Sequence, residues 1–189
     1  MSYQSKSFLA ALLGGCAILA AAAERSVEAK EAGIHFASPM IRDGGCFLAP
    51  AVLEGKSAVR IDYNAFETRW LEFAIRRITF KEELPEITVE ADFFLPAAGE
   101  IAAISLRVCD RDNETWQMKQ PLPEQAAGWI TLRYQFRPGE GMKGGSWGPK
   151  EKKNGKFDWP ISLSGFACSY RKAERLGFIG VGQIRVITP

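Results

Sequence analysis

The sequence is poor in the side chains from which most metal centres are built. It has one histidine, His35, and four cysteines among 189 residues. No two cysteines have the Cys-x-x-Cys spacing, which argues against a zinc site made of cysteine and histidine. After residue 23, no apolar run approaches the roughly 18 residues needed to cross a bilayer. No segment keeps a long 3.6-residue period, so we expect no long helix.

Charge of either sign is also not in excess. The chain has 24 basic and 22 acidic residues, which gives a formal net charge of +2. This balance gives no reason to expect nucleic acid or an anionic membrane as a partner. The basic run 150–153 stands beside Asn154-Gly155 and is typical of a solvated loop. A chain of this length holds one domain with a substantial core.

The first 23 residues have the pattern of an export signal. Lys6 supplies a positive charge, residues 8–19 form an interrupted apolar segment, and Ala21 to Ala23 offer a small-residue cleavage site. We therefore expect a signal peptide at 1–23 and a secreted or periplasmic mature chain. The alternative is a lipoprotein anchored through Cys16, because Leu13-Gly14-Gly15-Cys16 resembles the bacterial lipobox. Apolar residues continue past Cys16, which favours simple secretion.

Removal of the signal leaves three cysteines, Cys46, Cys109 and Cys168. This odd count allows at most one internal disulfide, and the pairing stays open. Cys109 and Cys168 both lie in strand-like runs, so we expect them to be buried as small apolar residues.

The rest of the chain consists of short runs with alternating apolar side chains. Residues 24–33 are polar and end in Gly33, so we interpret them as a linker or a fraying helical turn. From Ile34 on, the alternating runs recur between turn signals. The expected strands are 57–63, 68–75, 86–95, 101–109, 114–120, 129–136, 161–170 and 176–187.

These one-sided strands favour an all-β fold, a two-sheet antiparallel β-sandwich over residues 34–189. A parallel sheet would need crossover segments of about a dozen residues between strands, and these are missing. The longest connection, residues 138–159, is rich in glycine and has no strand pattern. Long loops inside compact domains are commonly functional or mobile.

The order of several short motifs adds to this interpretation. Strand 104–108 leads into the acidic turn Asp110 to Glu114 and then Thr115-Trp116; Gly128 to Leu132, Ser146-Trp147-Gly148 and the closing strand 182–186 follow. This order resembles the galactose-binding-like jelly-roll family, which is found in many carbohydrate-binding modules of secreted glycoside hydrolases. The resemblance covers residues 55–188, most closely 104–187, and rests on the order of the motifs.

The resemblance implies a jelly roll that binds a polysaccharide or oligosaccharide without cleaving it, as an accessory to glycan degradation. The implied partner is therefore a glycan, with a catalytic domain or protein as a second partner. Family members that bind structural calcium often end in an acidic closing strand. Arg185 stands where that carboxylate is expected here, so we expect no cofactor.

Aromatic side chains are the first candidates for sugar contact, because indole rings stack on the C–H faces of pyranoses. Trp147 lies in a glycine loop, where burial is hard to arrange, with packing within the loop as its alternative. Trp159 stands at the exit of the same loop, with core packing as its alternative. Trp70 and Glu72 share the non-core face of their strand and are candidates for a binding sheet face, with cross-strand packing as the alternative.

Charged residues supply further candidates. Arg107 opposes the core side of its strand and is suited to bidentate hydrogen bonds to a ligand, with a surface ion pair as the alternative. Glu90 and Asp92 are expected on a non-core face, where they pair with Arg107 or receive sugar hydroxyls.

The acidic turn is a weak candidate for calcium. Asp110, Asp112 and Glu114 alternate in a way that offers oxygen ligands to the ion. The turn lacks the EF-hand pattern, and hydrogen bonds that stabilise the turn itself are the favoured interpretation.

Two other function classes stay open. Jelly-roll glucanases and polysaccharide lyases use the same architecture, and Glu90 and Asp92 would stand about 7 Å apart on one strand face. Phe94 occupies the position at which the glucanases carry a third carboxylate, which disfavours this alternative. The other class is a surface or adhesion protein that recognises another protein through the same loops.

Overall fold

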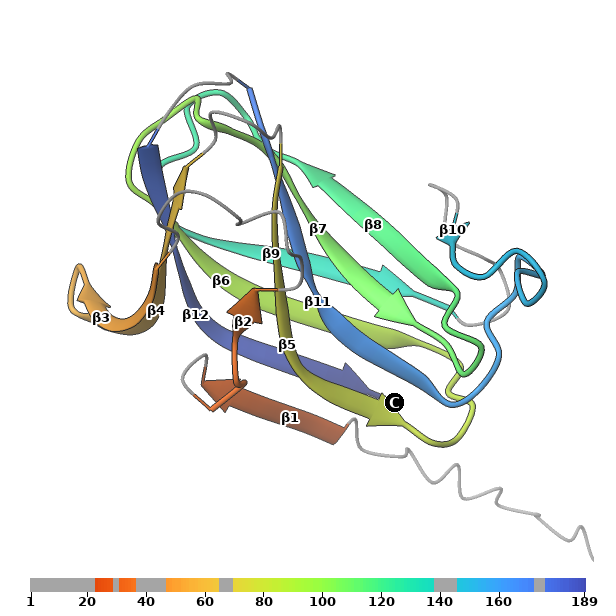
Figure 1. Ribbon diagram of the computed structural model, residues 1–189. Helices are drawn as coiled ribbons and strands as arrows, with labels where there is room; N and C mark the ends of the chain where they lie inside the picture. The colour runs from red at the N-terminus through yellow and green to blue at the C-terminus, as the bar shows by residue number, and fades with distance from the viewer. Residues whose placement is uncertain (1–22, 29–30, 37–46, 65–69, 138–145, 172–175) are drawn as a thin grey trace, which may run out of the picture.

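The computed structural model describes residues 23–28, 31–36, 47–64, 70–137, 146–171 and 176–189. Twelve strands, and no helix that could span a membrane, occur in this part of the chain. The strands form two antiparallel sheets of six strands each, which confirms the predicted sandwich (Figure 1). The signal segment 1–22, Cys16 and Cys46 lie outside the described residues, so the hypotheses on them remain predictions.

The two sheets are called sheet A and sheet B below. Sheet A has the spatial order β3 (Phe47–Leu53), β4 (Lys56–Asn64), β12 (Leu176–Thr188), β6 (Ile87–Leu95) and β9 (Gly128–Phe136), with β1 (Ala23–Glu28) also paired to β12. Sheet B has the order β10 (Ser146–Trp147), β8 (Thr115–Pro121), β7 (Ile101–Cys109), β11 (Ile161–Tyr170), β5 (Trp70–Phe80) and β2 (His35–Phe36).

The chain crosses repeatedly between the sheets. The connections β5 to β6, β6 to β7, β8 to β9 and β11 to β12 each join one sheet to the other. This is the connectivity of a jelly roll. In Figure 1 the β3–β4 hairpin lies at one end of the molecule and β10 at the other.

The core lies between the sheets and is built from alternate residues of each strand. On β6, Ile87, Val89 and Phe93 are fully buried, as their alternation predicts. Phe166 of β11 stands at the centre and contacts Phe93 of the facing sheet, with ring centroids 5.3 Å apart. Burial of each such side chain stabilises the fold by about 1.5–3 kcal/mol.

One local prediction is wrong. Residues 24–28, interpreted as part of a linker or a fraying helical turn, belong to β1 and run antiparallel to β12, with Val27 opposite Ile184. The pattern was hidden because β1 lies at the edge of the sheet: Val27 packs against the core, while residues 23–26 are exposed. Ala32 is also buried, and its carbonyl oxygen accepts a 2.6 Å hydrogen bond from the Arg76 amide.

Candidate functional site

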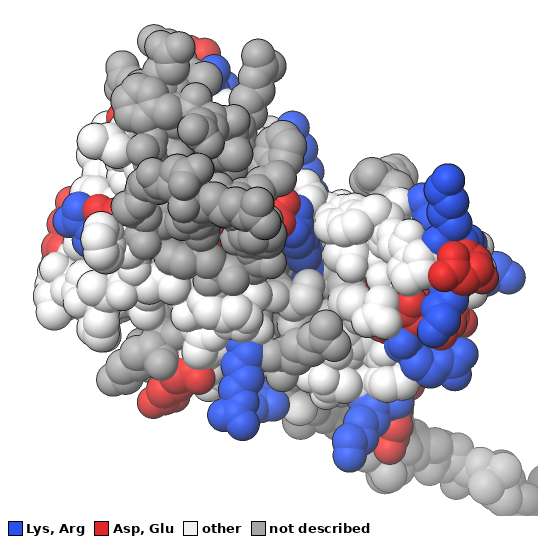
Figure 2. All heavy atoms as spheres, viewed as in Figure 1, with Lys and Arg blue, Asp and Glu red and all other residues white. Residues whose placement is uncertain are grey.

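The outer face of sheet B has a floor of small side chains. On β7 and β11 this floor contains Ala103, Ser105 and Ala167, each at most 4% exposed although none points into the core. Because these side chains are short, the larger groups beside them rise above the sheet. Figure 2 shows this side of the molecule, where the surface is indented beside the part that carries β10, and both acidic and basic atoms lie in the indentation.

Glycine at position 165 allows the strands of this floor to approach closely. β11 has a bulge between Leu163 and Gly165, in its pairing with β5 as well as with β7. A Cβ atom on Gly165 would lie 2.2 Å from the carbonyl oxygen of Phe73 and 2.7 Å from Cα of Ala74. The glycine φ of +149° is also one that L side chains rarely adopt. No other residue fits here without moving the strand.

Arg107 and Glu72 meet above the floor. Arg107 on β7 and Glu72 on β5 reach across β11, which presents Gly165 and Ala167 between them. Arg107 Nη2 donates a 2.5 Å hydrogen bond to Glu72 Oε1, and both side chains are 17% exposed. Among the described residues, the buried Arg107 Nε has no hydrogen-bond acceptor.

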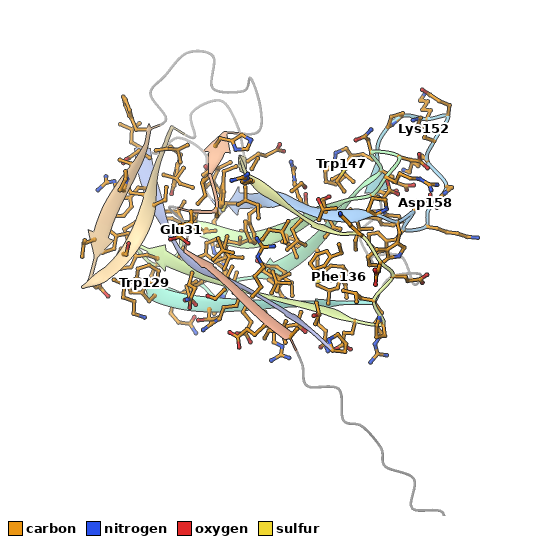
Figure 3. All side chains as sticks on the ribbon, turned by 90° about the horizontal axis from the view of Figure 1, so that it is seen from below. Glu31, Trp129, Phe136, Trp147, Lys152 and Asp158 are labelled. Atoms are coloured by element: carbon orange, nitrogen blue, oxygen red, sulfur yellow. The ribbon has the colours of Figure 1, made fainter. Side chains whose placement is uncertain are left out.

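Trp147 lies beside Arg107 of this pair. Figure 3 shows Trp147 at the end of the molecule that also carries Lys152 and Asp158. β10 is the edge strand and pairs with β8, with Trp147 opposite Thr115, and this register places the indole on the outer face of sheet B. The Arg107 guanidinium carbon is 4.9 Å from the centroid of the Trp147 ring, in a cation–π arrangement. The residue is nevertheless 43% exposed. The cation thus orients the ring without covering it.

Gln117 belongs to the same surface and was not proposed from the sequence. It is the cross-strand neighbour of Arg107 on β8, and its Nε2 donates a 3.1 Å hydrogen bond to Ser105 Oγ. The signal that would have found it is the register of β7 against β8, because glutamine in a polar strand has no distinguishing pattern of its own.

The remaining tryptophan candidates stand differently. Trp159 is half-buried and packs against the core, which is the alternative that the sequence left open. The backbone of Trp70 pairs with Ser169, two positions before Glu72 on β5. The side chain of Trp70 is outside the part of the structure that is described. The structure therefore brings Trp147, Arg107 and Glu72 together and leaves Trp159 with the core.

The acidic turn uses its carboxylates to hold backbone amides. Asp110 Oδ1 accepts hydrogen bonds from the amides of Asp112 (2.9 Å) and Glu114 (2.8 Å), which is the turn-stabilising role that the sequence favoured. Burial raises the pKa of Asp110, and these backbone amides oppose the rise. Among the described residues, no three His, Cys, Asp or Glu side chains converge as ligands for a metal.

The outer face of sheet A carries the two carboxylates of the glucanase alternative. Glu90 accepts a 3.4 Å hydrogen bond from Arg133 and forms an ion pair with Arg185, whose Nε lies 3.3 Å from its carboxylate. Asp92 accepts a 3.5 Å hydrogen bond from Arg185. The suggested pairing of Glu90 and Asp92 with Arg107 is wrong, because β6 lies in the opposite sheet. Arg185 thus contacts both acids, and Arg133 supplies a second positive charge to Glu90.

Trp129 also lies on sheet A, at the opposite end of the molecule from Trp147 (Figure 3). Its indole N–H donates a 3.0 Å hydrogen bond to the carbonyl oxygen of Leu53, and its ring contacts Phe94. The ammonium group of Lys56 lies 5.2 Å from the ring centroid. These contacts tie Trp129 to the β3–β4 hairpin, so packing accounts for its position.

Comparisons with known proteins find similarity in structure alone. No family model and no curated protein matches the chain. A family 11 carbohydrate-binding module of a cellulosomal cellulase of Clostridium thermocellum matches with a TM-score of 0.51 and 14% identity, over 90% of this chain and 97% of that one.

A second structure, the family 11 module from Clostridium thermocellum in complex with a β-1,3-1,4-mixed-linked tetrasaccharide, also matches. Its TM-score is 0.51 and its identity 14%, over 87% of this chain and 95% of that one. At this level of identity the similarity establishes the fold. The chain therefore has the jelly-roll fold of these modules, as the motif order predicted.

Proposed function

We propose that this chain is a non-catalytic carbohydrate-binding module that binds a polysaccharide or oligosaccharide on the outer face of sheet B. One observation carries the proposal: the exposed ring of Trp147 stands beside the Arg107–Glu72 pair, above a floor of small side chains. The shared jelly-roll fold supports it. The signal pattern at 1–23 supports an extracytoplasmic location, and an accessory role in glycan degradation follows from the resemblance.

The chemistry of these groups suits a sugar. A pyranose has an apolar C–H face and a rim of hydroxyl groups. The open area of the Trp147 ring covers the apolar face. The partly exposed Arg107 side chain offers guanidinium N–H donors to a hydroxyl, and the Glu72 carboxylate is an acceptor. Since Arg107 and Glu72 neutralise each other, the site has no excess charge that would demand a charged ligand.

The position of the other carboxylates supports binding without cleavage. Glu90 and Asp92 lie on sheet A, where both are paired with arginines of the same sheet. Neither is therefore available beside the proposed sugar site on sheet B. Glycoside hydrolysis needs two carboxyl groups that flank the scissile bond. No second function is proposed.

Affinity electrophoresis against a panel of polysaccharides tests the proposal. The panel should include a β-1,3-1,4-mixed-linked glucan, because a similar module was solved with that type of tetrasaccharide. We expect retardation of the wild type on at least one glycan and weaker retardation of Arg107→Ala. The control Arg133→Ala, on the outer face of sheet A, should migrate like the wild type.

Two results would contradict the proposal. Migration unaffected by every glycan in the panel would remove the binding assignment. Release of reducing sugar ends from a bound glycan would show that the protein is an enzyme.

A further inference from the structure

Glu114 is a buried carboxylate that connects the sandwich to both ends of a surface loop. Glu114 is the last residue of the acidic turn, directly before β8, and it is 0% exposed. The hydroxyl of Ser146 donates to Glu114 Oε1, and the amide of Asn154 donates to Oε2 at 3.0 Å. The amide of Gly155 donates to the same oxygen at 3.2 Å. Trp147 lies within the segment that these bonds enclose.

The chain on the other side of Trp147 is held by the same turn. A Cβ atom on Gly148 would lie 2.8 Å from the carbonyl oxygen of Asn113 and 3.1 Å from Cα of Glu114. The backbone at Gly148 therefore rests directly on the turn. Since Ser146 and Gly148 flank Trp147, the residues before and after the indole are both fixed against Asn113 and Glu114.

The hydrogen bonds offset the cost of placing a carboxylate here. Burial by itself raises the pKa of Glu114, but the bonds from Ser146, Asn154 and Gly155 outweigh it, and the pKa lies below its usual value. The positive charge of Lys153 acts in the same direction, and its ammonium group donates to the Ser146 carbonyl oxygen. The ionised carboxylate is therefore the form that holds the loop.

An apolar side chain at position 114 would fill the same volume without the cost of burying a charge. Packing alone therefore does not explain a carboxylate here, whereas its hydrogen bonds to the loop do. We propose that Glu114 is a positioning residue that holds the Trp147 ring against Arg107 at the edge of the sugar site. Its contribution to ligand affinity passes through Trp147. The ligand part of this inference rests on the proposed function; the position of the indole does not.

The test uses the full chain labelled with 5-fluorotryptophan, whose fluorine spectrum resolves the five tryptophans separately. Trp147→Phe assigns the resonance of Trp147. In Glu114→Ala we expect that resonance to move or broaden, while the resonance of Trp129 on the other sheet stays in place. Ser146→Ala removes one of the loop's hydrogen bonds to Glu114 and leaves those from Asn154 and Gly155. It should shift the same resonance less, which keeps the test valid if Glu114→Ala folds poorly.

The binding arm measures affinity for the β-1,3-1,4-mixed-linked tetrasaccharide by calorimetry. Loss of hydrogen bonds to a charged group predicts about a tenfold weaker affinity for Glu114→Ala. In the Trp147→Ala background the same change should have no further effect. The control Ile61→Val removes one buried methyl group from β4, far from the loop, and should lower stability without changing affinity.

The outcomes separate the two claims. A Trp147 resonance that is unchanged in both Glu114→Ala and Ser146→Ala would overturn the positioning role. So would a further loss of affinity when Glu114→Ala is added to Trp147→Ala. If the wild type binds no glycan, the proposed function fails, and the fluorine spectrum still decides the role of Glu114.

Discussion

Replacement of Trp147 by alanine should weaken glycan binding by about an order of magnitude. A tryptophan side chain offers up to about 250 Å² of surface. The residue is 43% exposed, so roughly 105 Å² of it faces solvent by this measure. If a pyranose covers about half of that area, burial at ~25 cal/mol per Å² contributes about 1.3 kcal/mol, or about tenfold in affinity.

Isothermal titration calorimetry with the mixed-linked tetrasaccharide measures this loss. Trp147→Tyr should retain most of the affinity, because tyrosine also offers an aromatic face. Trp129→Phe is the matched control, since Trp129 lies on the opposite sheet and is held there by Leu53 and Phe94. Equal affinity of Trp147→Ala and the wild type would refute the reasoning, and so would a loss of binding confined to Trp129→Phe.

Three further predictions concern the supports of the site. Gly165→Ala should lower the free energy of unfolding, measured in urea, by about 2–4 kcal/mol, because its Cβ would overlap the Phe73 carbonyl. The control Gly155→Ala is also at positive φ but in open space, and it should lower this free energy by only about 1 kcal/mol. Equal losses in the two variants would show that the overlap at Gly165 has no effect. Arg107→Lys keeps the charge but loses the planar group over Trp147, so calorimetry should show weaker binding, and unchanged affinity would contradict that role. The pKa of Glu114 is lower in the folded protein than in the unfolded chain, so its ionised carboxylate stabilises the fold at pH values above the unfolded-state pKa. This contribution is lost as the pH falls through the lower folded-state pKa. Thermal unfolding of Glu114→Gln should therefore depend less on pH below about pH 4.5 than that of the wild type; parallel curves would contradict the assignment.

The strands that contribute to the core could be predicted from the sequence because their alternation is strong. On β6 every second residue from Ile87 to Leu95 is buried, and a period of two has one interpretation. The edge strands gave weaker signals. β3 (Phe47–Leu53) has no polar residue to alternate with, contains Pro50 and lies at the border of sheet A, and β10 has only two residues. Neither carries the pattern of a half-buried strand.

The candidate site could be predicted residue by residue but not as an arrangement. Arg107, Glu72 and Trp147 were each selected from their local position, on strand faces that point outward or in a glycine loop. Their meeting depends on the order β10-β8-β7-β11-β5 and on the bulge at Gly165. Strand order is a long-range property, and the same limit explains why Glu90 and Asp92 were suggested as partners of Arg107.

The role of Glu114 shows this limit most clearly. Its spacing with Asp110 and Asp112 resembles a set of calcium ligands, whereas the groups that occupy its oxygens lie 32 to 41 residues further along the chain. A pattern within one turn contains no information on a loop that returns to it from so far away.

Amide chemical-shift mapping with the mixed-linked tetrasaccharide tests the central claim most directly. The account predicts that the largest shifts cluster on the outer face of sheet B, at Ser105, Arg107, Gly165 and Ala167, and at the indole N–H of Trp147. Shifts centred on the outer face of sheet A, around Glu90 and Trp129, would contradict it.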